Sequence, residues 1–267
     1  MDQEIVIAGK YGEVTITSEK NEKGEPCKYL YIGDNLAGGK TQSVIYEDRP
    51  QHIDWFYPHG MLAPMLVTGS PRKILIIGLG GGMLLRMLRP SFPDMDITIC
   101  EISPDVVQAA KEHFQIDDYP FRLIEGDALK FIEETEETFD WIISDAFWVD
   151  VVPISRLNNV DVFRLMRSRL NEDGNLIVNI VRKPKPVEMA LYDAFDGHQY
   201  SVYSGDKDDT HILVGLNSDR PRNFSITAMR NMASGFTSMN LPCGTDWNNL
   251  VDCILRHSPH TNVRLVL

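Results

Sequence analysis

The chain has few cysteines and no recognisable metal-binding spacing. It contains four cysteines in 267 residues, and no two of them form a Cys-x-x-Cys pair. Without such pairs, neither a zinc site nor a disulfide framework is indicated, and the seven histidines form no ligand pattern either. We therefore expect reduced thiols and no bound metal. The cysteines are Cys27, Cys100, Cys243 and Cys253.

Long apolar runs and clusters of basic residues are also missing. No apolar stretch reaches membrane-spanning length, and the N-terminus, Met1-Asp2-Gln3-Glu4, lacks the basic region of a secretory signal. Lysines and arginines number 26 against 38 acidic residues, which gives a formal net charge of -12 and disfavours a phosphate backbone as a partner. We expect a cytoplasmic protein that binds neither membranes nor nucleic acid.

A buried strand followed by a glycine-rich turn is the clearest pattern in the chain. Residues 74–77 read Ile-Leu-Ile-Ile after Pro71, as in a strand covered on both faces of a parallel sheet. The glycines that follow allow positive φ angles, and a helix opening at Met83 presents its free N–H groups to a ligand. The pattern predicts a nucleotide-binding turn, although Met83 stands where a dinucleotide fingerprint has its third glycine, and an ordinary strand-to-helix turn stays open. The glycines are Gly78, Gly80, Gly81 and Gly82.

Residues 1–55 predict a small antiparallel β unit. Short runs of alternating apolar residues are separated by turn residues, at 5–7, 14–16, 30–32 and 44–46. A sheet of this size is not stable alone, so we expect it to pack on the following domain or on a second subunit. Its exposed edges favour a homodimer.

From about residue 73 the chain alternates between strands and helices. Ser103-Pro104-Asp105 has the residues of a helix start, and two runs at 199–203 and 211–215 predict an antiparallel hairpin that closes the sheet. This predicts an α/β fold with a doubly wound, mostly parallel seven-stranded sheet of the methyltransferase-like (Rossmann-like) type over residues 56–217. Residues 218–267 predict a helical tail packed on this domain. The strands between the glycine turn and the hairpin are expected at 96–100, 121–124, 141–144 and 175–181.

Acidic residues follow three of the predicted strands. Ligands of open α/β sheets bind beyond the carboxyl ends of the strands. Glu101, roughly 20 residues beyond the glycines, is placed to accept hydrogen bonds from ribose hydroxyls. Asp127 is placed to accept from an adenine amino group, and Asp145 ends the next strand. A solvated loop acid, or a helix cap for Asp127, is the alternative for each one singly. The set with the glycines favours an adenosine pocket.

These motifs together resemble the spermidine synthase (polyamine aminopropyltransferase) family. The resemblance spans about residues 28–215 and is strongest over 73–145, through Ile74 to Gly82, Cys100 to Val107, Gly126-Asp127-Ala128 and Phe139 to Asp145. It implies that Glu101 holds ribose, that Asp127 with Ala128 holds adenine, and that Asp145 is the catalytic residue at the incoming amine. Gln42, in Thr41-Gln42-Ser43-Val44, matches a family glutamine near the acceptor.

Three positions depart from the family pattern. Gly81 stands where the family has an acid that holds the donor's ammonium, Trp148 replaces a second acid after Asp145, and Thr41 replaces a tyrosine. Phe147 and Trp148 offer aromatic faces to a cation, or else form a gate or ordinary packing. Asp150, Asp54 or Asp145 is expected to hold the displaced ammonium. We predict Gln42, Phe147, Trp148 and Asp150 as substrate-binding residues.

The resemblance implies transfer of an aminopropyl group from decarboxylated S-adenosylmethionine to an amine (polyamine) acceptor. The glycine at position 81 favours instead an S-adenosylmethionine-dependent methyltransferase, because it removes the partner of an ammonium and spares a carboxylate a repulsion. A nicotinamide oxidoreductase and a non-catalytic ligand-binding homologue are further alternatives. An ordinary aspartate, with a pKa about six units below that of an alkyl amine, would orient the amine rather than deprotonate it.

Overall fold

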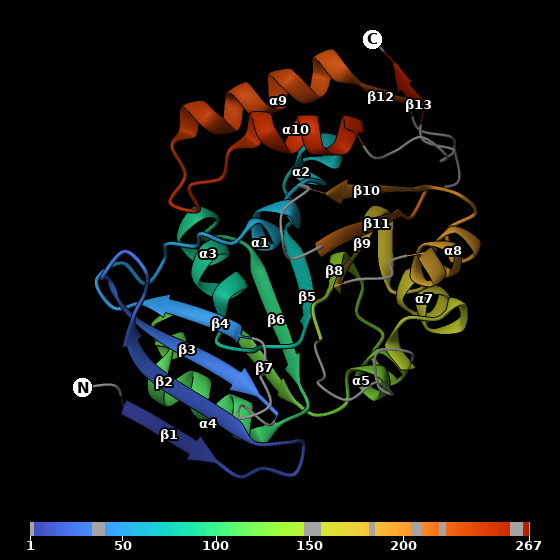
Figure 1. The fold of residues 1–267 in the computed structure, drawn as a ribbon. Coiled ribbons are helices and arrows are strands. Elements are labelled where there is room, and N and C mark those ends of the chain that lie inside the picture. The colour runs from blue at the N-terminus through green and yellow to red at the C-terminus, as the bar shows by residue number, and fades with distance from the viewer. Residues whose placement is uncertain are drawn as a thin grey trace.

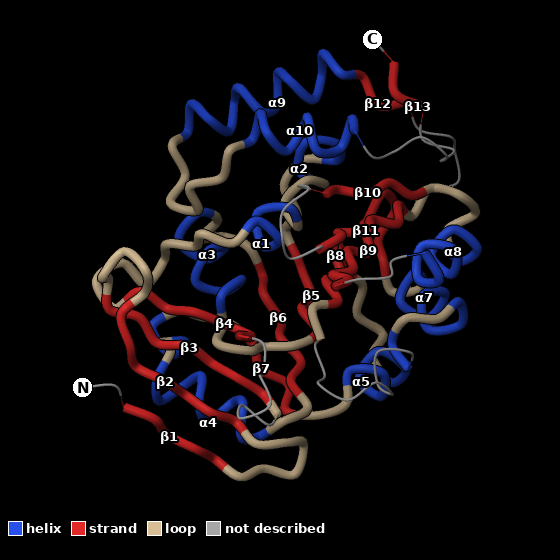
Figure 2. Tube along the Cα trace, in the orientation of Figure 1, coloured by secondary structure: helices blue, strands red, loops and turns tan. Residues whose placement is uncertain are grey.

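The computed structural model describes residues 3–33, 41–146, 156–181, 185–203, 210–218, 223–256 and 264–266. The N-terminal strands form an antiparallel sheet in the order β1-β2-β3-β4 (Figures 1 and 2). The predicted β unit is therefore present, with each strand longer than its apolar run. Its strands are β1 (Gln3–Ile7), β2 (Val14–Lys20), β3 (Pro26–Ile32) and β4 (Thr41–Tyr46).

The central sheet has seven strands in the order β10-β11-β9-β8-β5-β6-β7. The five strands from β9 to β7 run parallel, whereas β11 pairs antiparallel with both β9 and β10. This confirms the predicted doubly wound sheet with its closing antiparallel hairpin. The strands are β5 (Lys73–Ile77), β6 (Asp96–Glu101), β7 (Arg122–Glu125), β8 (Phe139–Ser144), β9 (Leu170–Val181), β10 (Gln199–Tyr203) and β11 (Thr210–Leu216).

Helices cover both faces of this sheet (Figure 1). Ile74 and Ile76 of β5 belong to one apolar cluster, which includes residues of α1, α2, α3, α9 and α10. Leu75 and Ile77 belong to a second cluster, with residues of α5, α7 and α8. The continuous apolar run of β5 follows from this burial on both faces. The helices are α1 (Phe56–Gly60), α2 (Met65–Thr68), α3 (Met83–Ser91), α4 (Pro104–His113), the 3-10 helix η2 (Ile116–Asp118), α5 (Ala128–Glu134), α7 (Val160–Arg167), α8 (Lys185–Ala194), α9 (Ile226–Met239) and α10 (Trp247–Arg256).

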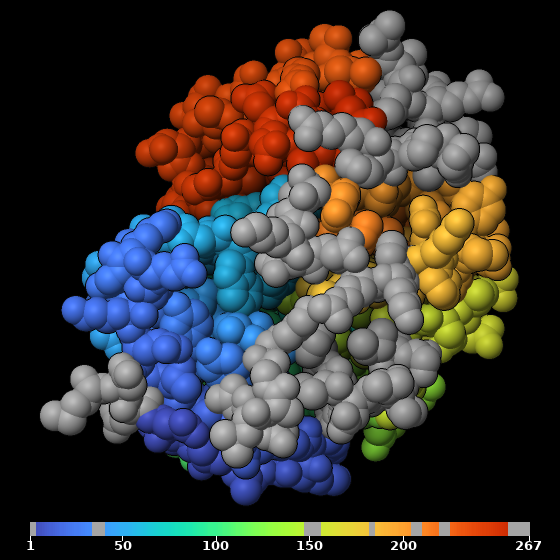
Figure 3. Space-filling view, in the orientation of Figure 1, coloured from blue at the N-terminus to red at the C-terminus, as the bar shows by residue number. Residues whose placement is uncertain are grey.

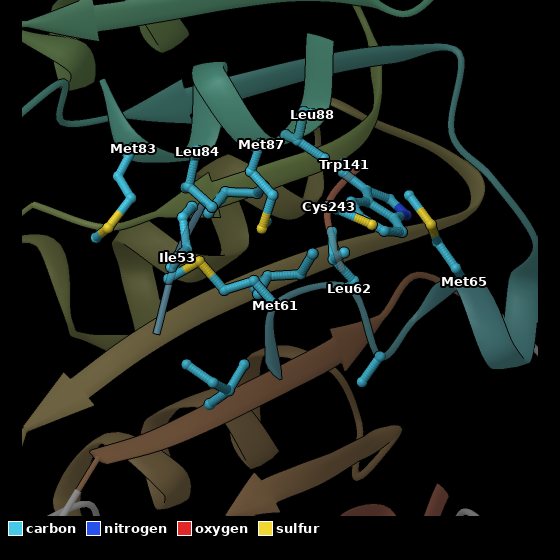
Figure 4. Packing of buried hydrophobic residues seen from close by; sticks show 14 of the residues in the cluster. Ile53, Met61, Leu62, Met65, Met83, Leu84, Met87, Leu88, Trp141 and Cys243 are labelled. Carbon is cyan, nitrogen blue, oxygen red and sulfur yellow. The ribbon is translucent and has the colours of Figure 1, made fainter. Parts of the chain in front are cut away.

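The segment before β5 packs closely on α3. Figure 4 shows Met61 and Leu62 facing the side chains of Met83, Leu84 and Met87. Methionine is flexible enough to fill the irregular space between short helices. Apolar packing against the segment before β5 therefore holds the helix that begins at the glycine turn.

The N-terminal sheet packs on α4 of the same chain. Val14, Ile16 and Leu30 are buried against Val106 and Phe114. α4 begins as predicted, because Ser103 is its N-cap and accepts a hydrogen bond from the Val106 N–H at 3.3 Å. The apolar face of the small sheet is thus covered within one chain, and the homodimer stays a prediction, as do the domain bounds at residues 55 and 217.

The C-terminal helices lie across the opposite end of the molecule from the N-terminal sheet. In Figure 3 the residues of α9 and α10, in orange to red, and the N-terminal residues, in blue, lie on either side of the residues that follow β4. Phe236 and Trp247 stack with ring centroids 4.4 Å apart and join α9 to α10. A short parallel pair, β12 (Asn223–Ser225) and β13 (Arg264–Val266), was not predicted. None of the helices within the described ranges has the length and apolar character needed to cross a bilayer.

Candidate active site

A cavity of about 860 Å³ lies at the carboxyl ends of β5, β6, β7 and β8. The N-terminal sheet closes one side of it, since residues of β3 and β4 contribute to the lining. Phe147, Trp148 and Asp150, predicted to bind substrate, lie outside the described residues. The predicted site residues that line the cavity are Gln42, Gly78, Gly80, Gly82, Glu101, Asp127, Ala128 and Asp145.

Gly78 brings the glycine turn against the end of β8. Its φ is +99°, and a Cβ built there would lie 2.7 Å from the backbone oxygen of Asp145. The Asp145 N–H donates to Ile77 O at 2.9 Å, so both chains are held at this close approach. A glycine is required here for its conformation and for its lack of a side chain. The turn consequently fixes where Asp145 leaves the sheet.

Gly81, unlike Gly80 and Gly82, is not among the residues that line the cavity. Its N–H donates to Ser43 Oγ of β4 at 2.9 Å, and its carbonyl accepts from the buried Arg86 guanidinium. Arg86 also donates to Val44 O at 2.8 Å. A Cβ at Gly81 would lie 2.8 Å from side-chain atoms of both Ser43 and Phe114. The N-terminal sheet therefore holds the glycine turn in place through this residue.

We predict that Gly81→Ala destabilises the fold by about 1 to 3 kcal/mol, because the added methyl group overpacks the contact with Ser43 and Phe114. Chemical denaturation measures the change. Gly126→Ala is the matched control, since a Cβ there meets no atom within 4 Å, and it should change stability little. Equal stability of the two variants would contradict this account.

Glu101 lies at the end of β6 with both carboxylate oxygens facing backbone donors. The Leu79 N–H donates to Oε2 at 2.8 Å and the Ser103 N–H to Oε1 at 2.9 Å. Burial raises the pKa of Glu101, and the backbone N–H groups around it oppose that rise. The backbone N–H groups of Ile102 and Gly80 also stabilise the carboxylate. The carboxylate thus joins the glycine turn to the start of α4 at the lining of the cavity.

Asp127 is a helix cap and an ion-pair partner at once. Its Oδ1 accepts from the Leu129 N–H at 3.0 Å, and Arg156 Nη2 lies 2.7 Å from Oδ2. The helix-cap alternative is therefore present in the structure. Ala128 follows it as the first, buried residue of α5. Arg156, which also lines the cavity, was not foreseen from the sequence, because no local pattern links it to a residue 29 positions away.

Asp145 is half-buried where β8 ends and has one polar neighbour from β9. Asn179 Nδ2 donates to Asp145 Oδ1 at 2.8 Å. Burial raises the pKa of Asp145 to about 7, and the hydrogen bond from Asn179 opposes the rise. Burial, and to a lesser degree the charge of Asp145, also raise the pKa of Tyr57. At neutral pH this carboxyl group is poised between its acid and its base form.

Three consecutive aromatic residues line the cavity beside Asp145, and none of them was predicted as a site residue. They precede and open α1, and the rings of Trp55 and Tyr57 lie with centroids 6.0 Å apart. A run of three aromatic residues is a visible signal, but nothing local indicates which surface it covers. The residues are Trp55, Phe56 and Tyr57.

Asp54, one of the acids expected to hold an ammonium, contacts Tyr46 and His52 instead of the cavity. It is not in the cavity lining. Tyr46 Oη donates to its Oδ2 at 2.6 Å, and His52 Nε2 lies 2.6 Å from its Oδ1. Hydrogen bonds, first that from Tyr46, lower the pKa of Asp54. Its carboxylate therefore organises the loop after β4.

The described residues hold no group of three or more His, Cys, Asp or Glu side chains that could bind a metal ion. His59, which is partly buried, makes two hydrogen bonds within the protein instead. Its Nδ1 lies 2.9 Å from Thr245 Oγ1 and its Nε2 lies 2.9 Å from Ile53 O, so it links the segment before α1 to the C-terminal helices. Burial lowers the pKa of His59.

The fold of the chain is similar to the folds of several solved structures. The chain is similar to a probable spermidine synthase from Corynebacterium glutamicum, with a TM-score of 0.67 and 17% identity over 86% of this chain and 87% of that one. It is also similar to human Methyltransferase-like protein 13 in complex with SAH, with a TM-score of 0.54 and 22% identity over 68% of this chain and 87% of that one. At these identities the likeness establishes the methyltransferase-like fold.

Sequence comparison is more specific. The chain is 32% identical over 184 residues to Polyamine aminopropyltransferase 1 of Pseudomonas aeruginosa, which covers 66% of this chain and 64% of that relative. The chain thus spans just under two thirds of the length of the relative it matches. The family described as the spermine/spermidine synthase domain matches residues 58–189, which include the glycine turn and all three acids at the strand ends. The chain is thus similar to the spermine/spermidine synthase family over about half of its length.

Proposed function

We propose that this protein is an alkyl transferase that moves an aminopropyl group from decarboxylated S-adenosylmethionine to an amine acceptor. One observation carries the proposal: Asp145, with a pKa raised to about 7, lines the same cavity as Glu101 and the glycine turn. The group proposed to bind ribose and the group proposed to receive the amine thus line one cavity. The volume, about 860 Å³, suits a substrate pair of this size.

For the donor, Glu101 would accept from the ribose hydroxyls and would share its oxygens with the backbone N–H groups around it. The adenine would lie at the start of α5, beside Asp127 and Ala128. Because Arg156 already pairs with Asp127, an adenine amino group would share that carboxylate with the guanidinium. The decarboxylated donor supplies a carbon activated by its positively charged sulfur.

Asp145 would accept the proton that the amine loses. The nitrogen lone pair attacks the carbon next to sulfur, the carbon–sulfur bond breaks, and its electron pair leaves with a neutral thioether, so no general acid is needed. An alkyl ammonium has a pKa near 10. Proton transfer from it to a carboxylate with a pKa near 7 therefore costs about 4 kcal/mol, instead of about 8 kcal/mol for an ordinary aspartate. The raised pKa therefore gives Asp145 a part in proton transfer beyond the orienting role expected of an ordinary aspartate.

Methyl transfer from S-adenosylmethionine is the second candidate, and Gly81 favours it. The carboxylates in the described part of the cavity lining are those of Glu101, Asp127 and Asp145. None of them lies on the glycine turn, where an acid would hold the donor's ammonium. Without that acid, the carboxylate of ordinary S-adenosylmethionine would meet no repulsion from the turn.

The leaving group distinguishes the two reactions. We predict that the protein, incubated with decarboxylated S-adenosylmethionine and a panel of amines, forms 5′-methylthioadenosine, which mass spectrometry identifies. The panel includes putrescine, spermidine, cadaverine and monoamines, and the control omits the protein. S-adenosylhomocysteine formed from the ordinary donor would establish methyl transfer instead. Binding of 5′-methylthioadenosine without turnover of either donor would identify a non-catalytic homologue.

A further inference from the structure

Asn179 is the polar side chain that β9 places against Asp145. β8 and β9 run parallel with Ser144 opposite Val178, so the next residue of each chain, Asp145 and Asn179, lie beside one another at the carboxyl end of the sheet. Both residues line the cavity. Asn179 Nδ2 donates to Asp145 Oδ1 at 2.8 Å. The hydrogen bond therefore ties the proposed proton acceptor to a strand that has neighbours on both sides.

The amide of Asn179 is oriented by the carboxylate that it faces. An ionised carboxylate only accepts hydrogen bonds, so the NH₂ group of the amide points to it and the carbonyl oxygen points away. Within the described structure that oxygen, Asn179 Oδ1, is buried and has no hydrogen-bond partner. A buried acceptor without a donor costs stability. Packing alone would favour an apolar residue at this position, which indicates that Asn179 serves its contact with Asp145.

This contact fixes both oxygens of Asp145. A carboxylate is planar, so an Oδ1 held against β9 also sets the direction of Oδ2. A carbonyl oxygen accepts a hydrogen bond better than the hydroxyl oxygen of a carboxylic acid does. The N–H group that faces Oδ1 therefore favours the acid form in which the proton lies on Oδ2. One oxygen is thus assigned to the strand and the other to the proton.

The other titratable groups around the cavity act on Asp145 less directly. Tyr57 faces it from α1, and burial raises the pKa of Tyr57, so its hydroxyl stays neutral near pH 7. Glu101 accepts from the glycine turn, and Asp127 is paired with Arg156 at the start of α5. Burial raises the pKa of Asp145, and among the described side chains it is Asn179 whose hydrogen bond opposes the rise.

We infer that Asn179 is a positioning residue for the proposed reaction: its side-chain N–H holds Asp145 Oδ1 against β9, turns Oδ2 to the incoming amine and stabilises the ionised carboxylate. This rests on the proposed function, in which Asp145 takes the proton of the amine. The amide itself neither gains nor loses a proton. In the transfer step the proton passes from the amine nitrogen to Asp145 Oδ2, while Oδ1 keeps its hydrogen bond to Asn179.

The test is the pKa of Asp145 in Asn179→Leu. NMR titration of protein labelled with ¹³C at the aspartate carboxyl groups measures it, and Asp145→Asn identifies the signal. Leucine has a similar branched shape and cannot donate. We expect the pKa of Asp145 to rise by about one to two units above the wild-type value, the effect of losing one hydrogen bond to a charged group. An unchanged or lower pKa would overturn the inference. If leucine prevents folding, Asn179→Ala removes the same donor and should shift the pKa in the same direction.

Asn175→Leu is the matched control. Asn175 lies four residues earlier on β9, on the same side of the strand, and its buried Oδ1 also has no hydrogen-bond partner in the described structure. Its Nδ2 donates to Thr68 Oγ1 at 3.0 Å, and it is not among the residues that line the cavity. This substitution should leave the pKa of Asp145 unchanged. An equal rise in both variants would assign the effect to a disturbed strand and would count against Asn179.

Kinetics separate positioning from ionisation. In Asn179→Leu, the rise of kcat/KM with pH should move to higher pH together with the pKa of Asp145. At a pH well above both pKa values, kcat should stay about 10- to 100-fold below the wild type, because Oδ2 is no longer held toward the amine, while the KM for the donor should change little. A wild-type kcat at that pH would contradict the positioning role. If neither donor yields a thioether, the proposed reaction fails, and the NMR titration still decides the inference on Asn179.

Discussion

Replacing Asp145 by asparagine should stabilise the folded protein above neutral pH. Burial raises the pKa of Asp145 from 3.8 to about 7, so the fold favours the neutral acid and opposes the carboxylate. A rise of that size corresponds to an opposing free energy of up to about 4 kcal/mol once the group is ionised. Asparagine is neutral at every pH and can still accept the hydrogen bond from Asn179. It therefore escapes this cost.

The effect has a defined pH window. Between the ordinary pKa of an aspartate, near 4, and about 7, the folded state binds a proton that the unfolded state has lost. The stability contributed by this group therefore falls as pH rises through that window, and it stays low above it. The difference in unfolding free energy between Asp145→Asn and the wild type should grow from near zero at about pH 4 to its full value above pH 7.

Denaturant unfolding at several pH values measures this difference, and Asp140→Asn is the control of opposite sign. At Asp140, burial favours a higher pKa, but hydrogen bonds from Asn171 and from the backbone N–H groups of Arg72 and Lys73 outweigh it and lower the pKa. Its replacement should destabilise the fold at neutral pH. An Asp145→Asn variant no more stable than the wild type above pH 7 would contradict the raised pKa.

The same substitution should remove most of the transfer activity. If Asp145 accepts the proton of the incoming amine, its loss should lower kcat/KM by about 10²- to 10⁴-fold, the range for a general base. In the wild type, kcat/KM should rise with pH through about 7 as the carboxyl group ionises. A variant that is more stable and nearly inactive would be the signature of a functional group held at a cost to the fold.

Replacing Glu101 by glutamine should weaken the binding of 5′-methylthioadenosine by about ten- to hundredfold. The carboxylate would lose its charge-assisted bonds to the ribose hydroxyls, at roughly 1.5 to 3 kcal/mol. The amide would also turn an N–H group toward a backbone donor, because Leu79 and Ser103 each donate to one carboxylate oxygen. We therefore expect a loss of stability as well as a loss of affinity.

Calorimetry measures the affinity, with Glu125→Gln as the matched control. Glu125 pairs in register with Glu101 at the end of the neighbouring strand β7, but it is exposed and does not line the cavity. This control makes the same change of charge away from the ligand. Unchanged affinity in Glu101→Gln would mean that the adenosine part binds elsewhere or not at all.

The sequence alone determined the strands of the central sheet in chain order and the edge of that sheet at which the cavity lies. The apolar run of β5, the cap at Ser103 and the spacing of Glu101, Asp127 and Asp145 are local patterns. Each depends on neighbours within a few residues, or on the rule that the carboxyl ends of parallel strands share one edge. These features could therefore be predicted before any contact was known.

Only the tertiary structure decided what surrounds each of those residues. Gly81 lies against Ser43 of β4, Arg156 pairs with Asp127, and the Trp55 to Tyr57 segment forms the wall beside Asp145. These contacts join segments that are far apart in the sequence, and no local periodicity encodes them. The raised pKa of Asp145 follows from burial by several such segments at once, so the chemistry of the site depends on packing that the sequence pattern does not specify.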